Sequence, residues 1–131
     1  MARYFTPDEA NAALPEVRPL AERMVELRRK LLEAEAREER LAAKVAGNGG
    51  GIDLADAAKA REGVERAMRA LAAAVDAIVA RGIQVKDLDT GLLDFPSLRD
   101  GEEVLLCWRL GEDEVAWWHR PEDGFAGRRP L

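Results

Sequence analysis

Apolar residues recur at alternating spacings of three and four along most of the chain up to residue 78. This spacing is typical of coiled-coil helices, which pack along one apolar seam. In the first stretch the seam is interrupted at Glu38 and otherwise consists of Val17, Leu20, Met24, Leu27, Leu31, Ala34, Leu41 and Val45. In the second stretch it consists of Ala57, Ala60 or Arg61, Val64, Met68, Leu71, Val75 and Ile78.

A glycine-rich segment at residues 47–51 separates the two seams, and no helix tolerates such a run. Asp53 is a suitable N-cap for a second helix, and Arg81-Gly82 is a suitable C-cap. Residues 16–81 are therefore predicted to form a long antiparallel helical hairpin, a coiled coil. Its arms would measure roughly 40 to 45 Å at about 1.5 Å per residue.

A separate helix start is visible near the N-terminus. Thr6 can act as N-cap, Pro7 suits the first helical position, and Glu9 completes a capping box with Thr6. Pro15 and Pro19 follow closely, and proline disfavours helical geometry in the residue before it and removes a backbone donor. The sequence therefore predicts a short helix over residues 6–14 and a break at residues 14–16.

The periodicity changes after Gly82. Short runs at residues 83–86 and 92–95 have strand character, and residues 103–109 and 114–119 flank a turn at residues 110–113 in the pattern of a β-hairpin. The remaining tail is rich in turn residues and is predicted to be coil. Residues 1–131 are thus expected to form a single α+β domain, with a small antiparallel β module and coil tail at residues 82–131.

Charge and composition narrow the function. The net charge of −5 makes nucleic acid an unlikely partner, because phosphate binding requires clustered Lys and Arg. A single Cys cannot form an intramolecular disulfide, and the N-terminus lacks the apolar segment of a secretory signal. No apolar run approaches the ~20 residues that span a bilayer. These features favour a cytoplasmic protein that does not enter membranes.

Two stretches, FTPDEANAALPEVRP and VKDLDTGLLDFPSLRDGEEVLLCWRLGEDEVAWWHRPEDGFAGRRP, resemble a family of short uncharacterised prokaryotic proteins, a domain of unknown function. The resemblance implies no activity, cofactor or partner. It implies that the motifs VKD, DFP, LCW, WH and GFAGR belong to one module. Their positions here are around Asp87, Asp94, Cys107, Trp108, His119 and Phe125.

The segment 104–119 holds all three tryptophans, the only cysteine and the only histidine. If its two strands pair, Cys107 and His119 come close, and with Asp87, Asp89 or Asp94 they would form a zinc site or a Cys-His nucleophile pair. A zinc signature normally repeats its ligands at short spacings, which this sequence does not do. We therefore expect no stoichiometric zinc and no other cofactor. Cys107 is then a small buried hydrophobe, and His119 a hydrogen-bonding group at the sheet margin.

The tryptophans predict that both sides of this hairpin need cover. Trp117 and Trp118 must point to opposite faces, because consecutive side chains alternate in a strand. Helices can cover one face, and the tail, a second copy of the chain or a ligand the other. The predicted interface or ligand-binding residues are Trp108, Arg109, Trp117, Trp118, His119 and Arg120, with the arginines at the rim.

The predicted hairpin tip carries the pattern D-x-x-D-x-A, beginning with Asp53 and Asp56. Over these residues it resembles the tip of coiled-coil transcription factors that insert into the RNA polymerase secondary channel. The simpler interpretation is that Asp53 caps the helix and Asp56 faces its positive end.

The sequence favours a non-enzymatic interaction or adaptor protein, which binds a protein partner or a second copy of itself as a homodimer. The first alternative is a small metal-dependent or thiol enzyme that uses Asp87, Asp94, Cys107 and His119. The second alternative is an RNA polymerase secondary-channel regulator that acts through the hairpin tip.

Overall fold

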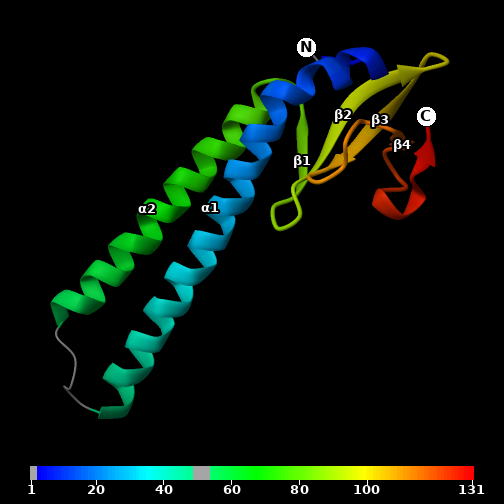
Figure 1. Ribbon diagram of the computed structural model, residues 1–131. Helices are drawn as coiled ribbons and strands as arrows, with labels where there is room; N and C mark the ends of the chain where they lie inside the picture. Colours follow the sequence, from blue (N-terminus) through cyan, green and yellow to red (C-terminus); the bar gives the residue numbers. More distant parts are fainter. Residues whose placement is uncertain (1–2, 49–53) are drawn as a thin grey trace.

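The computed structural model describes residues 3–48 and 54–131 and shows the predicted α+β fold (Figure 1). Within this part of the chain, two helices precede a five-stranded antiparallel sheet, and the predicted Asp53 cap lies outside it. The elements are α1 (Pro7–Asn48), α2 (Leu54–Val79), β1 (Gln84–Asp87), β2 (Leu92–Arg99), β3 (Glu102–Arg109), β4 (Trp117–His119), the 3-10 turn η1 (Phe125–Gly127) and β5 (Arg129–Pro130).

The two helices form an antiparallel hairpin that extends well beyond the sheet, and both termini lie at the sheet end (Figure 1). The 42 residues of α1 correspond to about 63 Å at about 1.5 Å per residue. Val17, Met24, Leu27 and Leu31 of α1 are buried as predicted. On α2 the buried residues are Ala60, Val64, Leu71, Ala74 and Ile78.

The predicted place of Met68 in this seam is wrong, since its side chain is 52% exposed. Ala67, one residue earlier, packs against the core instead. The spacing 60, 64, 67, 71, 74, 78 keeps the alternation of four and three that a straight seam requires. Apolar character alone did not distinguish Met68 from Ala67.

The polar interruption of the first seam also has a partner. Glu38 Oε1 lies 3.5 Å from Arg61 Nη1 across the two helices. Arg61 was an alternative to Ala60 as a seam position, and the structure buries Ala60 while Arg61 reaches toward Glu38 from the seam margin. The two irregular positions of the predicted seams therefore compensate each other.

The predicted break at residues 14–16 is wrong, because α1 runs without interruption through Pro15 and Pro19. The predicted capping box is present at its start, where Thr6 and Glu9 each accept a hydrogen bond from the backbone N–H of the other. Tertiary contacts explain how the helix tolerates both prolines. Asn11 and Arg18, on either side of Pro15, are both held by the segment between β3 and β4.

Asn11 Oδ1 accepts a hydrogen bond of 2.7 Å from the N–H of Val115, and Asn11 Nδ2 donates to the Val115 carbonyl. Arg18 Nη2 donates to the Asp113 carbonyl at 3.0 Å. Leu14, on the same stretch of helix, is buried. These contacts hold the helix on both sides of Pro15, and the buried Ala21 and Met24 hold it after Pro19, so packing outweighs the local proline preference.

The strands follow the order β1-β2-β3-β4-β5, and neighbouring strands are antiparallel. The predicted hairpin of β3 and β4 is confirmed, although β4 begins at Trp117 rather than Glu114. β2 continues past Pro96 to Arg99, whereas the sequence predicted its end before Pro96. The tail is also not entirely coil, because β5 pairs with β4 there.

The two faces of the sheet have different surroundings. One face joins the helices in a common core, to which the sheet contributes Leu93, Phe95, Val104, Leu106, Trp108 and Trp118. By strand alternation, Asp94, Leu105, Cys107, Trp117 and His119 lie on the opposite face. The helices therefore cover one face of the sheet, and Asp94, Cys107 and His119 lie on the other.

Candidate functional site

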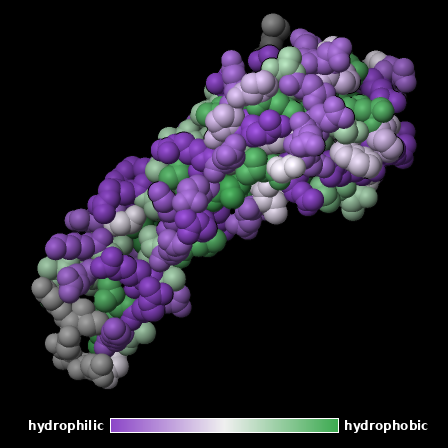
Figure 2. All heavy atoms as spheres, viewed as in Figure 1, coloured by the Kyte–Doolittle hydropathy of each residue, from purple (hydrophilic) through white to green (hydrophobic). Residues whose placement is uncertain are grey.

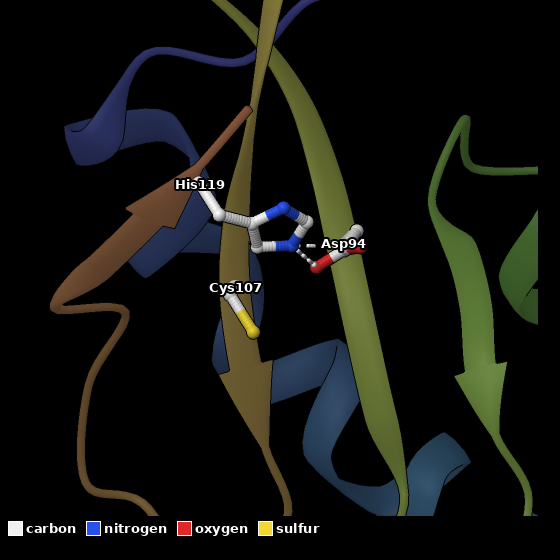
Figure 3. Close-up of side chains that lie close together, drawn as sticks. All are labelled: Asp94, Cys107 and His119. Atoms are coloured by element: carbon white, nitrogen blue, oxygen red, sulfur yellow. Dashed lines mark hydrogen bonds and ion pairs between the residues drawn. The ribbon is translucent and has the colours of Figure 1, made fainter. Parts of the chain in front are cut away.

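Asp94, Cys107 and His119 come together on the sheet face away from the helices (Figure 3). Asp94 and Cys107 are direct cross-strand partners on β2 and β3. His119 on β4 pairs with Leu105, which places it diagonally across from Cys107 on the same face. The three side chains are at most 3% exposed. The predicted proximity of Cys107 and His119 is therefore confirmed, and Asp94 completes the cluster.

Both ring nitrogens of His119 have partners. Nδ1 lies 2.8 Å from the Arg120 carbonyl oxygen, which can only accept, so Nδ1 carries a hydrogen. Nε2 lies 3.1 Å from each carboxylate oxygen of Asp94. A hydrogen bond between Nε2 and Asp94 therefore requires a second proton, on either the imidazole or the carboxyl group. A cation that binds both groups would replace this proton.

The thiol of Cys107 is held in its neutral form. Its pKa is raised from 9.0 to about 12, mainly by burial and in addition by the nearby Asp94 carboxylate. A thiolate nucleophile needs a lowered pKa and a partly exposed site, and Cys107 has neither. The geometry thus opposes the thiol-enzyme alternative, while a bound cation would still favour the thiolate.

Asp87 and Asp89 do not join the cluster. Asp87 accepts hydrogen bonds from the backbone N–H and the hydroxyl of Thr90, and these bonds lower its pKa. Asp89 forms an exposed ion pair with Arg28 of α1 at 3.1 Å. Asp87 therefore stabilises the turn between β1 and β2, and Asp89 stabilises the contact of this turn with α1.

Trp108 is completely buried in the core, and its Nε1 donates a 3.0 Å hydrogen bond to the Glu112 carbonyl. Trp118 is 9% exposed, and Arg99 lies 4.5 Å from its ring centroid. Trp117 is half-buried on the opposite face. Of the three predicted interface tryptophans, Trp117 keeps the most accessible surface in the chain as described.

The tail covers part of the face that carries the cluster, as one of the predicted alternatives required. Arg128 lies 5.0 Å from the ring centroid of Trp117 and forms an ion pair of 2.8 Å with Glu112. The two predicted rim arginines, Arg109 and Arg120, are exposed. Arg109 lies 5.3 Å from the ring centroid of Phe125.

The predicted hairpin tip falls largely outside the described residues, because Asp53 lies there. Asp56 is in the first turn of α2, where its charge favours the positive end of the helix. The structure thus gives the tip an ordinary helix-start role at Asp56 and adds nothing specific for a polymerase channel.

Sequence reasoning missed two grooves between α1 and α2, one on each side of the seam. The first, of about 500 Å³, is lined by Lys30, Glu33, Ala34, Arg37, Lys59, Ala60, Glu62, Gly63 and Arg66. The second, of about 260 Å³, is lined by Glu35, Glu38, Glu39, Ala42, Arg61 and Val64. We call them the basic groove and the acidic groove. The available signal was the helical spacing of like charges beside each seam.

These features define an α+β protein with a projecting helical hairpin and a buried Asp-Cys-His cluster on its sheet. The chain belongs to the family described as "Uncharacterized conserved protein (DUF2203)", whose match covers residues 3–131. No curated protein matches the chain, and no solved structure does. No helix in residues 3–48 or 54–131 is long and apolar enough to cross a membrane.

Proposed function

We propose that this protein is a non-enzymatic interaction protein, and that its hairpin docks an acidic surface of another protein in the basic groove. The observation that carries this proposal is the composition of the groove. Four cationic side chains surround a floor of small residues, namely Lys30, Arg37, Lys59 and Arg66 around Ala34, Ala60 and Gly63.

The charges of the basic groove are available to a partner. Lys30, Arg37, Lys59 and Arg66 are all exposed, and none of them forms an ion pair among the described residues. Of the two acidic side chains in the groove, Glu33 already pairs with Arg29. Figure 2 shows that hydrophilic side chains cover much of the hairpin on the side in view.

A second copy of the chain fits this groove less well than a different protein. The acidic groove would be its complement, but helical spacing places the residues that line the two grooves on opposite sides of the seam. Pairing one with the other is a heterologous contact, which stacks copies without closing a dimer. A homodimer through Trp117 stays a separate prediction.

The convergence of Asp94, Cys107 and His119 favours the metal part of the enzyme alternative but not catalysis. The three side chains are almost fully buried, and they line none of the grooves described above. Asp87, the fourth residue of that alternative, is elsewhere. A substrate has no route to the cluster in this arrangement, so we assign the working surface to the hairpin.

The test is affinity capture from a lysate of the source organism, with the wild type and the double variant Lys59→Glu/Arg66→Glu as bait. The control is Arg40→Glu/Arg69→Glu, which changes the same charge at exposed hairpin positions outside the groove. A protein with an acidic surface should bind the wild type and the control, and bind the groove variant at least about tenfold more weakly. Equal capture of the partner by all three baits would contradict the proposal. So would the capture of nothing but further copies of this chain.

A further inference from the structure

The Asp94, Cys107 and His119 side chains offer three different metal donors at one point of the sheet. One ligand atom of each, a carboxylate oxygen, the thiol sulfur and an imidazole nitrogen, lies within 4.8 Å of the others. In a tetrahedral zinc site such atoms are about 3.3 to 3.6 Å apart, given zinc–ligand distances of about 2.0 to 2.3 Å. The sequence led us to expect no stoichiometric zinc, because its ligands do not repeat at short spacings, but the convergence of three donors reverses this expectation. We propose that these three residues bind a divalent transition metal ion, with zinc as the preferred ion.

The orientation of His119 supports the proposal independently of the distances. Its Nδ1–H is directed at the Arg120 carbonyl oxygen, so Nε2 becomes a metal donor once the proton that it shares with Asp94 is released. Nε2 faces Asp94, as Figure 3 shows. Histidines that ligate metals characteristically donate their second ring N–H to a carbonyl or carboxylate in this way.

Charge balance also favours a divalent ion. A thiolate from Cys107 and a carboxylate from Asp94 carry two negative charges, and a neutral imidazole adds none. A divalent cation makes the buried group neutral, which avoids the high free energy of an unpaired buried charge.

The donor set selects the ion. Calcium and magnesium bind oxygen ligands, so the sulfur and nitrogen donors disfavour them. Thiolate, imidazole and carboxylate together suit zinc, and cobalt(II) has similar preferences among first-row ions. The three residues leave a fourth tetrahedral position for water or another small ligand. The burial of the cluster makes this a site that holds β2, β3 and β4 together.

The test uses the full chain, purified and then incubated with zinc. After dialysis, elemental analysis should give a zinc-to-protein ratio near one for the wild type. Loading with cobalt(II) should give an absorption band from thiolate-to-metal charge transfer. Cys107→Ser should lose this band and retain much less zinc. Asp87→Asn, which alters a carboxylate of the same sheet outside the cluster, should retain the wild-type ratio.

Circular dichroism of each variant shows whether the fold has survived. If Cys107→Ser does not fold, the cobalt band of the wild type decides alone. A folded wild type that retains no zinc and shows no thiolate band would overturn the proposal. So would a folded Cys107→Ser variant with the same zinc content as the wild type. Neither result affects the basic groove, which shares no residue with the cluster.

Discussion

The Nε2 nitrogen of His119 lies 3.1 Å from both carboxylate oxygens of Asp94, a residue 25 positions earlier in the chain. Asp94 lies on β2 and His119 on β4, and their side chains contact each other across the intervening β3. The contact therefore exists only when all three strands are in register. Its partners are buried, and loss of either one leaves an unsatisfied polar group. The pair therefore reports directly on the packing of the sheet.

We expect Asp94→Ala and His119→Ala each to lower the free energy of unfolding of metal-free protein by about 3 to 5 kcal/mol, because each leaves a buried partner alone. The double variant should lose clearly less than the sum of the single variants. Urea unfolding measures all three. The exposed pair of Arg28 and Asp89 is the control, for which removal should cost about 1 kcal/mol or less. Strict additivity at Asp94 and His119 would contradict their coupling.

The thiol of Cys107 predicts a pH dependence in metal-free protein. Its pKa in the folded chain is about 12, against 9.0 for the ordinary group. Below pH 9 the thiol is neutral in both states, so this contribution to stability is complete there. Between pH 9 and about 12 the unfolded chain loses the proton first, and stability falls.

Other groups also titrate in this range, so the measurement compares wild type with Cys107→Ala. The difference in unfolding free energy between the two should shrink as the pH rises from 9 toward 12. A constant difference would show that the folded thiol is not protected. Alkylation gives a second readout, because Cys107 should react with iodoacetamide at pH 9 only after the chain unfolds.

The hairpin seam predicts a contrast between two neighbouring apolar residues of α2. Leu71 is 7% exposed, whereas Met68 is 52% exposed. Leu71→Asp should therefore destabilise the hairpin by about 3 kcal/mol or more, because it buries a charge. Met68→Asp should change the stability by about 0.5 kcal/mol or less. Thermal melts followed by circular dichroism compare the stabilities of the two variants. Equal destabilisation would mean that the residues of α2 in the seam are not those described above.

Asn11 predicts how α1 is held through its prolines. Its Oδ1 satisfies the N–H of Val115, a residue that is 3% exposed. Asn11→Ala should lower the free energy of unfolding by about 1 to 3 kcal/mol, since a buried donor loses its partner. Asn11→Asp keeps the acceptor but loses the donor to the Val115 carbonyl, so it should be destabilising as well. Chemical denaturation tests both variants, and an unaffected Asn11→Ala would assign the continuity of the helix to other contacts.

Local sequence patterns predicted the elements whose cause is local. The capping box of Thr6 and Glu9, the hairpin and the pairing of β3 with β4 all follow from spacing and residue type. The continuous α1 does not, because Asn11 and Arg18 bind a segment about 95 to 104 positions away. Propensity rules weigh Pro15 and Pro19 without these long-range contacts, so they predicted a break.

The candidate site was predictable in its members but not in its geometry. The sequence brought Cys107 and His119 together through strand pairing, and it offered Asp87, Asp89 and Asp94 as equal partners. Only the register of β2 with β3 places Asp94 opposite Cys107. Asp87, at the end of β1, is engaged by Thr90, and Asp89, in the turn that follows, is engaged by Arg28. The basic groove could not be predicted, because its lining depends on how the two helices are rotated relative to each other. The seam of one helix does not specify this rotation.

Photo-crosslinking in living cells, with a photoreactive amino acid at one position of the hairpin, tests whether an acidic protein docks in the basic groove. We place it at Glu62, in the basic groove, and in a matched variant at Glu39, in the acidic groove. We predict a crosslink from position 62 to one acidic protein. The same crosslink should be absent from position 39, and it should be lost from position 62 when Lys59→Glu/Arg66→Glu is added. Equal crosslinks from both positions, crosslinks only between copies of this chain, or none from position 62 would contradict it.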